Sequence, residues 1–151
     1  MTAVAALDII VGMIRFFNTL SGSLEEFRPL REGKVRLYTC GPTVYDYPHI
    51  GNYRAYLFED LLKRFLIFYG YKVIHVMNLT DVDDKTIKRA RRLGISLQEY
   101  TAKYIEAFFE DSQVLRLLPA DIYPRATEHI PDMVRMVKGL LEKSFAYYKD
   151  N

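Results

Sequence analysis

The sequence predicts an α/β fold built around a parallel, Rossmann-like sheet with flanking helices. The first observation is a loosely alternating, strand-like run at 35–40, which leads into a loop containing glycine and proline at 41–48. The second is an amphipathic helix pattern at 51–69, and the third is an apolar, β-branched run at 73–77. Strand, helix and strand in this order form a right-handed βαβ unit, because parallel strands need a crossover connection.

The helix at 51–69 should pack one face against the sheet. Its large apolar residues recur at intervals of three and four, and Gly70 supplies the residue that ends it. The strand at 73–77 is apolar at nearly every position, as in parallel strands that are covered on both faces. The helix face predicted to be buried consists of Leu57, Phe58, Leu61, Leu62, Phe65, Leu66 and Tyr69.

Shorter signals flank this unit on both sides. A strand should begin at 16–18, followed by a turn at 21–23. On the other side, Ser96 and Glu99 have the spacing of a capping box, and Thr127 is expected to cap the last helix. The further elements predicted are helices at 83–93, 96–114 and from 127 to about 143, a loop with two prolines at 118–124, and a strand at 145–148.

Composition indicates one folded domain, because 50% of the 151 residues are hydrophobic and 14% are aromatic, which is enough for a core. The net charge is +2, so bulk electrostatics does not indicate a nucleic-acid binder. The single cysteine excludes an internal disulfide and a closed cysteine-rich zinc site within this chain, and it suits the reducing cytoplasm. No stretch is long enough to span a bilayer, so no membrane partner is predicted.

Residues 1–12 are interpreted as an N-terminal extension that the fold does not need. Their apolar part, 3–11, is short, and no positive residue precedes it as in a signal peptide. The alternative is that this stretch forms a short helix docked on the surface.

Chemistry is expected at the carboxyl ends of the two strands, where ligands bind in open α/β sheets. Cys40 ends the first strand, and Asn78 and Thr80 follow the second, so two separate motifs should meet in one crevice. The loop then runs into a helix N-terminus, whose free N–H groups and positive dipole end attract anions. His49 lies at that helix start, and Gly51 leaves room for a ligand to approach.

These motifs carry a resemblance to a known family. Residues 49–52, His-Ile-Gly-Asn, are similar to the His-Ile-Gly-His motif of class I aminoacyl-tRNA synthetases, and residues 40–46 resemble the segment just upstream in cysteinyl-tRNA synthetases. Residues 77–85 resemble that family's second-strand motif, and 124–130 its Pro-Arg-Ala-Thr segment. Because the motifs occur in order and at the family's spacing from about Met13 to the end, the chain is identified as a member of the cysteinyl-tRNA synthetase family.

The resemblance implies a truncated class I synthetase nucleotide-binding fold, in which residues 13–151 form the N-terminal part of the catalytic domain. The implied activity is ligation of cysteine to tRNA(Cys) through cysteinyl-adenylate, with ATP and Mg²⁺. The family's connective insertion, its Lys-Met-Ser-Lys-Ser loop and its anticodon-binding domain are expected downstream. We therefore expect this piece alone to be inactive.

For Cys40 the resemblance implies a zinc ligand that serves the selection of substrate. Without the motif, a buried strand cysteine would be the ordinary interpretation. Serine and cysteine differ by one atom, so shape discriminates them poorly, whereas Zn²⁺ prefers sulfur. Zinc needs about four ligands, and the others are expected downstream of this chain.

For His49 the resemblance implies contact with the ATP phosphates and stabilisation of the transition state of adenylate formation, with Asn52 as the second catalytic position. Asn52 departs from the motif's second histidine, although its amide still donates hydrogen bonds. The implied ATP site consists of Pro42, Thr43, His49, Ile50, Gly51 and Asn52. The implied substrate site consists of Cys40, Gly41, Thr43, Asn78 and Thr80.

Structural interpretations stand beside these roles. A set of aspartates at 81–84 suggests a metal or base cluster, but aspartates at a helix start are more often caps and dipole partners. Tyr45 and Asp46 fit an ordinary turn. One helical face is predicted to be solvated, with contact to the tRNA acceptor arm as the alternative, and it consists of Lys85, Lys88, Arg89 and Arg92.

Two other functions stay open. One is a ligase of the same superfamily that joins cysteine to an amino-sugar, although Pro42 and Val44 follow the synthetase pattern. The other is a non-catalytic fragment that binds a nucleotide or a partner protein.

Overall fold

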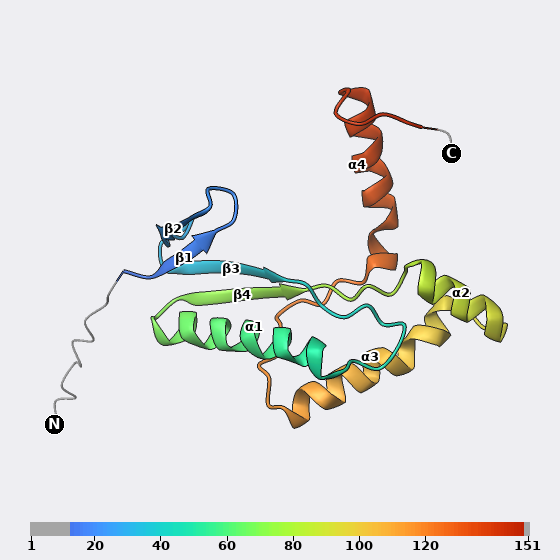
Figure 1. The fold of residues 1–151 in the computed structure, drawn as a ribbon, viewed down its shortest axis with the longest axis horizontal. Coiled ribbons are helices and arrows are strands. Elements are labelled where there is room, and N and C mark those ends of the chain that lie inside the picture. Colours follow the sequence, from blue (N-terminus) through green and yellow to red (C-terminus); the bar gives the residue numbers. More distant parts are fainter. Residues whose placement is uncertain (1–12, 150–151) are drawn as a thin grey trace.

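The computed structural model describes residues 13–149, so the predicted extension at 1–12 lies outside the described residues. A βαβ unit forms the middle of the molecule, with a small β-hairpin at one end and α2 toward the other (Figure 1). The elements are β1 (Arg15–Asn18), β2 (Ser23–Glu26), β3 (Lys34–Thr39), α1 (Ile50–Phe68), β4 (Lys72–Met77), α2 (Asp84–Leu93), α3 (Leu97–Val114), the 3-10 helix η1 (Ala126–His129) and α4 (Ile130–Glu142).

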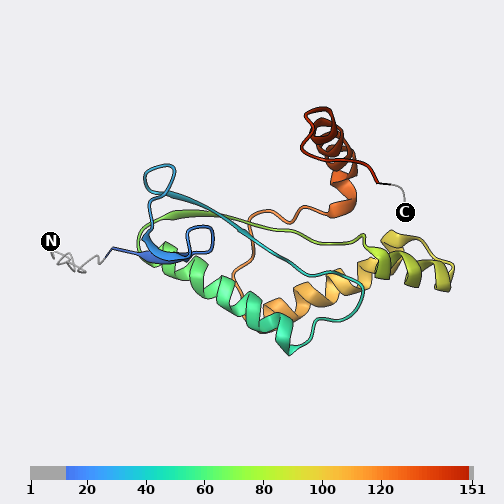
Figure 2. The same cartoon turned by 45° about the horizontal axis from the view of Figure 1, so that its top comes forward.

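The predicted parallel βαβ unit is confirmed. Strands β3 and β4 pair in parallel along their whole length, and α1 makes the crossover and lies against one face of this sheet (Figures 1 and 2). The prediction that β4 is covered on both faces is wrong. His75 and Met77 are buried, whereas Ile74 on the opposite face is 36% exposed. The cause is that the core joins this sheet to α1 and α3 on one side only.

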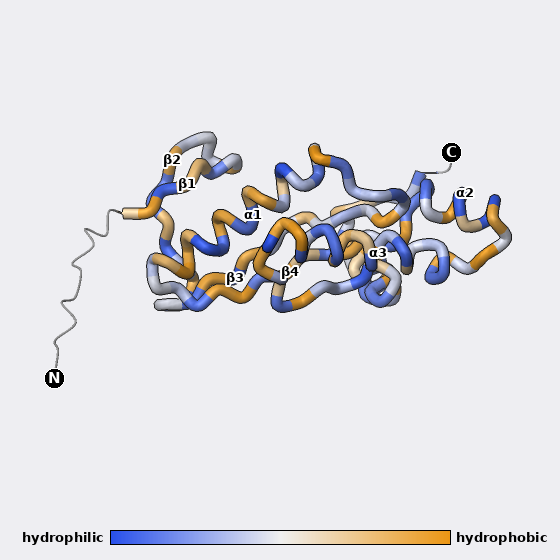
Figure 3. Tube along the Cα trace, turned by 90° about the horizontal axis from the view of Figure 1, so that it is seen from below, coloured by the Kyte–Doolittle hydropathy of each residue, from blue (hydrophilic) through white to orange (hydrophobic). Residues whose placement is uncertain are grey.

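Helix α1 buries only part of the predicted stripe: Leu66 is buried, and Leu62 and Tyr69 are half-buried. Its residues run apolar around most of the circumference, and Figure 3 shows hydrophobic and hydrophilic stretches alternating along it. Spacing alone therefore does not select the side that meets the sheet. The buried residues are Tyr53, Tyr56, Lys63 and Leu66. The predicted residues found exposed are Leu57, Phe58, Leu61 and Phe65.

A stretch predicted as a plain loop lies along the other edge of β4. The amide of Ile122 donates to the His75 carbonyl at 3.2 Å, and its carbonyl accepts from the Met77 amide at 3.0 Å. Further along, the Leu79 amide donates to the Pro124 carbonyl at 2.9 Å. The stretch therefore continues the sheet in the parallel direction. Its prolines obscured this in the sequence, because proline is rare inside strands.

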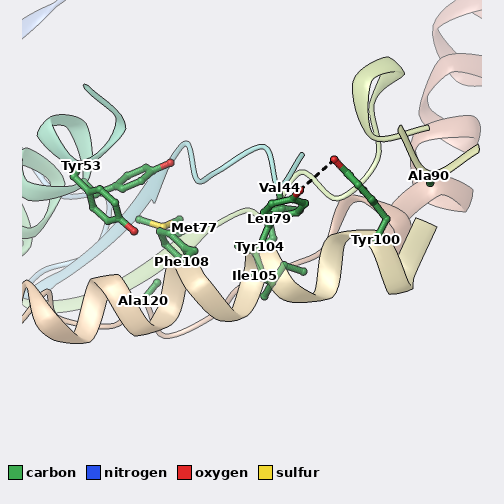
Figure 4. Close-up of a cluster of buried hydrophobic side chains, with 11 residues drawn as sticks. Val44, Tyr53, Met77, Leu79, Ala90, Tyr100, Tyr104, Ile105, Phe108 and Ala120 are labelled. Carbon is green, nitrogen blue, oxygen red and sulfur yellow. Dashed lines mark hydrogen bonds between the residues drawn. The ribbon is translucent and has the colours of Figure 1, made fainter. Parts of the chain in front are cut away.

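The core fills the space between β4, α1 and α3, and it is rich in tyrosine (Figure 4). The rings of Tyr56 and Phe108 meet edge to face with centroids 5.4 Å apart, and those of Tyr100 and Tyr104 do so at 5.3 Å. Burial, with a smaller effect from Glu59, raises the pKa of Tyr56 to about 12, so its hydroxyl stays neutral. The cluster consists of Val44, Tyr53, Tyr56, Met77, Leu79, Ala90, Tyr100, Tyr104, Ile105, Phe108 and Ala120.

Helices α2 and α3 begin and end close to the predicted residues. The Asp83 carboxylate caps α2 by accepting from the Thr86 amide at 2.7 Å, and Gly94 ends this helix with a φ of 68°. The Ser96 hydroxyl caps α3 by accepting from the Glu99 amide at 3.1 Å. Helix α4 buries none of its residues and stands away from the βαβ unit (Figure 1). Among the residues described, no helix has the length and apolar character required to cross a bilayer.

A buried carboxylate ties the end of β4 to η1. The Asp81 side chain is 4% exposed and accepts from the amide and the hydroxyl of Thr127, at 2.9 and 2.6 Å. The prediction that Thr127 caps the last helix is therefore wrong, because its hydroxyl is bound to Asp81 and α4 begins only at Ile130. The strand predicted at 145–148 is also wrong. No described strand edge lies beside these largely exposed residues to pair with them.

We predict that Asp81→Ala lowers the free energy of unfolding by about 2 kcal/mol, because it leaves two half-buried donors of Thr127 without an acceptor. Asp84→Ala is the matched control. This exposed aspartate in the first turn of α2 contributes about 0.5 kcal/mol through the helix dipole. Urea unfolding of the two variants and of the wild type tests the prediction, and equal losses in both variants would contradict it.

A second prediction concerns His75, whose side chain is 2% exposed and whose Nε2 lies 2.8 Å from the Thr39 hydroxyl. Burial, reinforced by Lys63, lowers the pKa of His75 from its ordinary 6.5. Below pH 6.5 the His75 side chain of the unfolded chain binds a proton, whereas that of the folded chain stays neutral to a lower pH. Stability should therefore fall as the pH drops from about 7 to about 5, by at most about 1.4 kcal/mol per pH unit.

The variant His75→Phe removes this titration and should show a smaller loss between the two pH values in urea unfolding. Subtracting the pH-dependent loss of the variant from that of the wild type cancels the contributions of the other titrating groups. A loss in His75→Phe as large as in the wild type would refute the assignment to His75.

Candidate functional site

The candidate site lies where β3 and β4 end, and the two strands stay paired beyond their formal ends. The Thr80 amide donates to the Pro42 carbonyl at 2.9 Å, and the Val44 amide donates to the Thr80 carbonyl at 3.1 Å. Thr43 and Thr80 form an isolated parallel bridge. The structure thus brings together the two motifs that the sequence predicted to converge.

Asn78 fastens this junction through its side-chain amide. Its Oδ1 accepts from the Gly41 amide at 3.2 Å and from the Tyr38 hydroxyl at 3.0 Å, and its Nδ2 donates to the Thr80 hydroxyl at 2.8 Å. A Cβ on Gly41 would lie 1.9 Å from the Asn78 carbonyl oxygen, so only glycine permits this approach. Three residues of the predicted substrate site therefore hold one another in place.

A polar hollow of about 260 Å³ lies between the loop after β3 and the start of α1. Cys40 is exposed beside this hollow, and Asn78 and Thr80 lie behind its wall, but none of the three is among the residues that line it. The lining residues are Gly41, Pro42, Thr43, Tyr45, Asp46, Tyr47, Pro48, His49, Asn52 and Tyr56. Ile50, predicted at the ATP site, is 89% exposed and does not line it.

His49 and Asn52 form a reciprocal cap at the start of α1. The His49 Nδ1 accepts from the Gly51 amide at 3.0 Å, and the Asn52 Oδ1 accepts from the His49 amide at 3.0 Å. A Cβ on Gly51 would lie 2.8 Å from His49 Cε1, so glycine keeps the ring in this position. The first turn of α1 carries no acidic residue, which leaves the positive end of the helix dipole uncompensated.

This cap fixes the tautomer of the His49 ring. Because Nδ1 accepts a hydrogen bond, it carries no proton, and the neutral ring must carry its proton on Nε2. The Nε2–H group, on an exposed residue that lines the hollow, is thus a donor available to an anion. The helix N-terminus and this donor together make the hollow chemically suited to phosphate.

The described residues do not make a complete metal site. Cys40 is exposed, and its Sγ makes one weak contact, 3.8 Å from the Gly41 carbonyl oxygen. Within residues 13–149, no group of three or more histidine, cysteine, aspartate or glutamate side chains gathers so as to hold a metal ion. An exposed thiol can serve as one ligand, but the residues present do not fit a closed zinc site.

Sequence reasoning missed what holds the far wall of the hollow. Tyr45 and Asp46 accept hydrogen bonds from Arg89 on α2, so Arg89 does not belong to a simply solvated face. This hydrogen bond from Arg89 is the main reason that the pKa of Asp46 lies below its ordinary value. The pairing of Arg89 with Asp46 spans 43 positions of sequence, and no local signal indicates it.

Comparison with known proteins agrees with these features. Residues 26–151 match the family model described as tRNA synthetases class I (C) catalytic domain. The cysteine–tRNA ligase of Chlamydia felis is 57% identical over 131 residues, which cover 87% of this chain and 27% of that protein. The corresponding ligase of Chlamydia pneumoniae is 58% identical, covering 87% and 28%, and that of Pyrococcus furiosus is 51% identical, covering 89% and 28%. The chain thus spans little more than a quarter of the length of these curated relatives.

We predict that Gly41→Ala lowers the free energy of unfolding by about 3 kcal/mol, because the Asn78 carbonyl it meets is backbone that cannot rotate away. Gly139→Ala is the matched control. Its added Cβ meets nothing within 4 Å, and alanine in the interior of α4 should stabilise by about 0.5–1 kcal/mol. Urea unfolding measures both changes, and a Gly41→Ala protein as stable as the wild type would show that the approach is not tight.

Proposed function

The chain belongs to the tRNA synthetases class I (C) catalytic domain family, and on this premise we propose that it is part of a ligase that joins cysteine to tRNA(Cys). The proposed substrates are cysteine, ATP with Mg²⁺, and tRNA(Cys). The names of the relatives support this, since each is a cysteine–tRNA ligase. The chain has a single cysteine, which also suits a protein of the reducing cytoplasm.

One observation carries the mechanism: His49 lines the hollow while its Nδ1 caps α1, which leaves its Nε2–H as the free donor of the ring. We propose that this donor binds a phosphate oxygen of ATP, together with the N-terminus of α1. Asn52 would act as a positioning residue, because its Oδ1 holds the His49 amide and so the backbone of the cap. Pro42 and Thr43 complete the proposed ATP site as lining residues, and Gly51 contributes the space beside the His49 ring, whereas Ile50 lies outside the hollow.

The proposed first step is attack by a carboxylate oxygen of cysteine on the α-phosphorus of ATP. The new P–O bond gives cysteinyl-adenylate, and the bond to pyrophosphate breaks. Negative charge on the phosphate oxygens grows in the transition state, and a fixed N–H donor stabilises that charge without needing to reorient. In the second step a ribose hydroxyl of the tRNA attacks the carbonyl carbon, and AMP leaves.

The proposed substrate site is the junction of Cys40, Gly41, Thr43, Asn78 and Thr80. Because Asn78 and Thr80 are used to hold the two strand ends, their contribution would be to shape the edge on which cysteine lies. Zn²⁺ with Cys40 as one ligand would select the substrate's sulfur over an oxygen. The remaining ligands would have to come from outside residues 13–149, so no step of the reaction is assigned to the metal.

His49→Asn tests the phosphate role, because asparagine is a good N-cap and keeps an acceptor for the cap while removing the Nε2–H donor. In the full-length protein that carries this chain, we predict a fall in cysteine-dependent ATP–pyrophosphate exchange of about 10²–10³-fold. His129→Ala, an exposed histidine paired with Asp132 on the other side of the fold, is the control and should leave exchange unchanged.

The isolated chain provides a second measurement. We expect it to give no exchange, and to bind ATP about tenfold more weakly in the His49→Asn variant, as measured by calorimetry. Absence of cysteine-dependent exchange in the wild-type full-length protein would overturn the proposed function. Equal ATP affinity in wild type and His49→Asn would overturn the role of His49.

A further inference from the structure

We propose that Arg89 is a positioning residue that holds the wall of the hollow, and with it His49, in place for the phosphates of ATP. The inference rests on the proposed function, which supplies the ligand. Arg89 lies on α2, outside the loop at 41–48 and outside the motif at the start of α1. The four residues of the predicted solvated face are all exposed, and Arg89 in addition binds the loop.

The Arg89 guanidinium reaches two consecutive residues of the loop. Its Nη1 donates to the Tyr45 carbonyl at 2.9 Å and to the Asp46 Oδ2 at 2.8 Å. The Tyr100 hydroxyl, from α3, donates to the same Tyr45 carbonyl at 2.7 Å. Two helices thus converge with three hydrogen bonds on Tyr45 and Asp46, two to the Tyr45 carbonyl and one to the Asp46 carboxylate, four and three residues before His49.

Aromatic contacts add to this grip. The Tyr45 ring has the Lys85 ammonium 4.6 Å and the Arg89 guanidinium carbon 5.1 Å from its centroid, which is the range of cation–π attraction. The Tyr47 ring meets the Tyr104 ring edge to face, with centroids 5.2 Å apart. Tyr45, Asp46 and Tyr47 all line the hollow, so the same contacts that fix these residues also fix the shape of its wall.

The exposure of the pair argues for positioning rather than for global stability. The side chains of Arg89 and Asp46 are 45% and 51% exposed, and ion pairs this open to solvent contribute little to the free energy of unfolding.

The loop itself makes few other hydrogen bonds that could hold it against α2 and α3. Tyr47 donates its amide to the adjacent Asp46 side chain, and His49 donates its own to Asn52. Without Arg89, the segment between Val44 and the cap would be tied to α2 and α3, within residues 13–149, only by the Tyr100 hydrogen bond and by the contacts of the Tyr45 and Tyr47 rings.

The test uses three variants of the chain: Arg89→Met, which keeps the length but removes the donors, Arg89→Lys, which restores one charge, and Arg92→Met as the control. Arg92 is on the same helix, exposed and without a hydrogen-bonded partner among the described residues. Amide hydrogen exchange in the ligand-free chain reports the order of the loop, and calorimetry reports ATP affinity. Thermal unfolding checks that the fold is intact.

For Arg89→Met we expect exchange at the Tyr47 and His49 amides to rise, and ATP affinity to fall, by about tenfold each, at an unchanged unfolding temperature. Arg89→Lys should recover part of both, and Arg92→Met should match the wild type. Adding Asp46→Asn to Arg89→Met should change little, because Arg89→Met has already removed the contact with Asp46.

If Arg89→Met matches Arg92→Met in amide hydrogen exchange and in ATP affinity, Arg89 does not hold the loop and the inference is wrong. If His49→Asn weakens ATP binding and Arg89→Met does not, the proposed function stands and the inference fails. A third outcome is that the wild type binds no ATP while amide hydrogen exchange still rises in Arg89→Met. In that case Arg89 does order the loop, but ATP is not the ligand of the hollow. The positioning role, which depends on that ligand, is then wrong.

Discussion

The close approach of two strand ends determines the rest of this structure. Gly41 has no side chain, and its backbone therefore lies against that of Asn78, whose amide then binds the Gly41 N–H. Because the strands stay paired through Thr43 and Thr80, the loop departs from a fixed base rather than from a frayed strand end. The hollow, the cap of α1 and the hydrogen bonds from α2 to the loop all depend on this paired base.

The site also shows how one side chain can serve structure and chemistry together. The His49 ring uses one nitrogen to satisfy a free N–H of the helix, and this leaves the other nitrogen as a donor with a defined proton. A histidine that made no such bond would exchange its proton between two nitrogens. The hydrogen bond that caps α1 therefore also fixes the proton on Nε2, the nitrogen that is left free to donate.

Local signals in the sequence were enough for most of the fold. The βαβ unit was predictable because its strands and helix have clear periods, and α2 because Asp83 and Gly94 mark its ends. The convergence of Cys40 with Asn78 and Thr80 followed from the rule that parallel strands end on one edge. The family resemblance named His49 directly, and the structure placed it at the cap of α1.

The parts that could not be predicted depend on distant partners. The buried side of α1 is chosen by α3 and β4, not by the spacing of its own residues. Thr127 has the sequence of a cap, yet its hydroxyl binds Asp81, 46 positions earlier. The edge of β4 is extended by a segment with prolines, and Arg89 reaches Asp46 across two other elements. Such pairings are properties of the assembled fold.

One consequence follows from the space beside Gly51. A methyl group there would touch the imidazole of His49, so positions 49 and 51 are sterically one unit. Redesign of this helix start cannot treat the two positions as separate choices, because a side chain at 51 would displace the His49 ring from its position at the cap. The spacing of the motif is in this sense a requirement for room beside an imidazole ring.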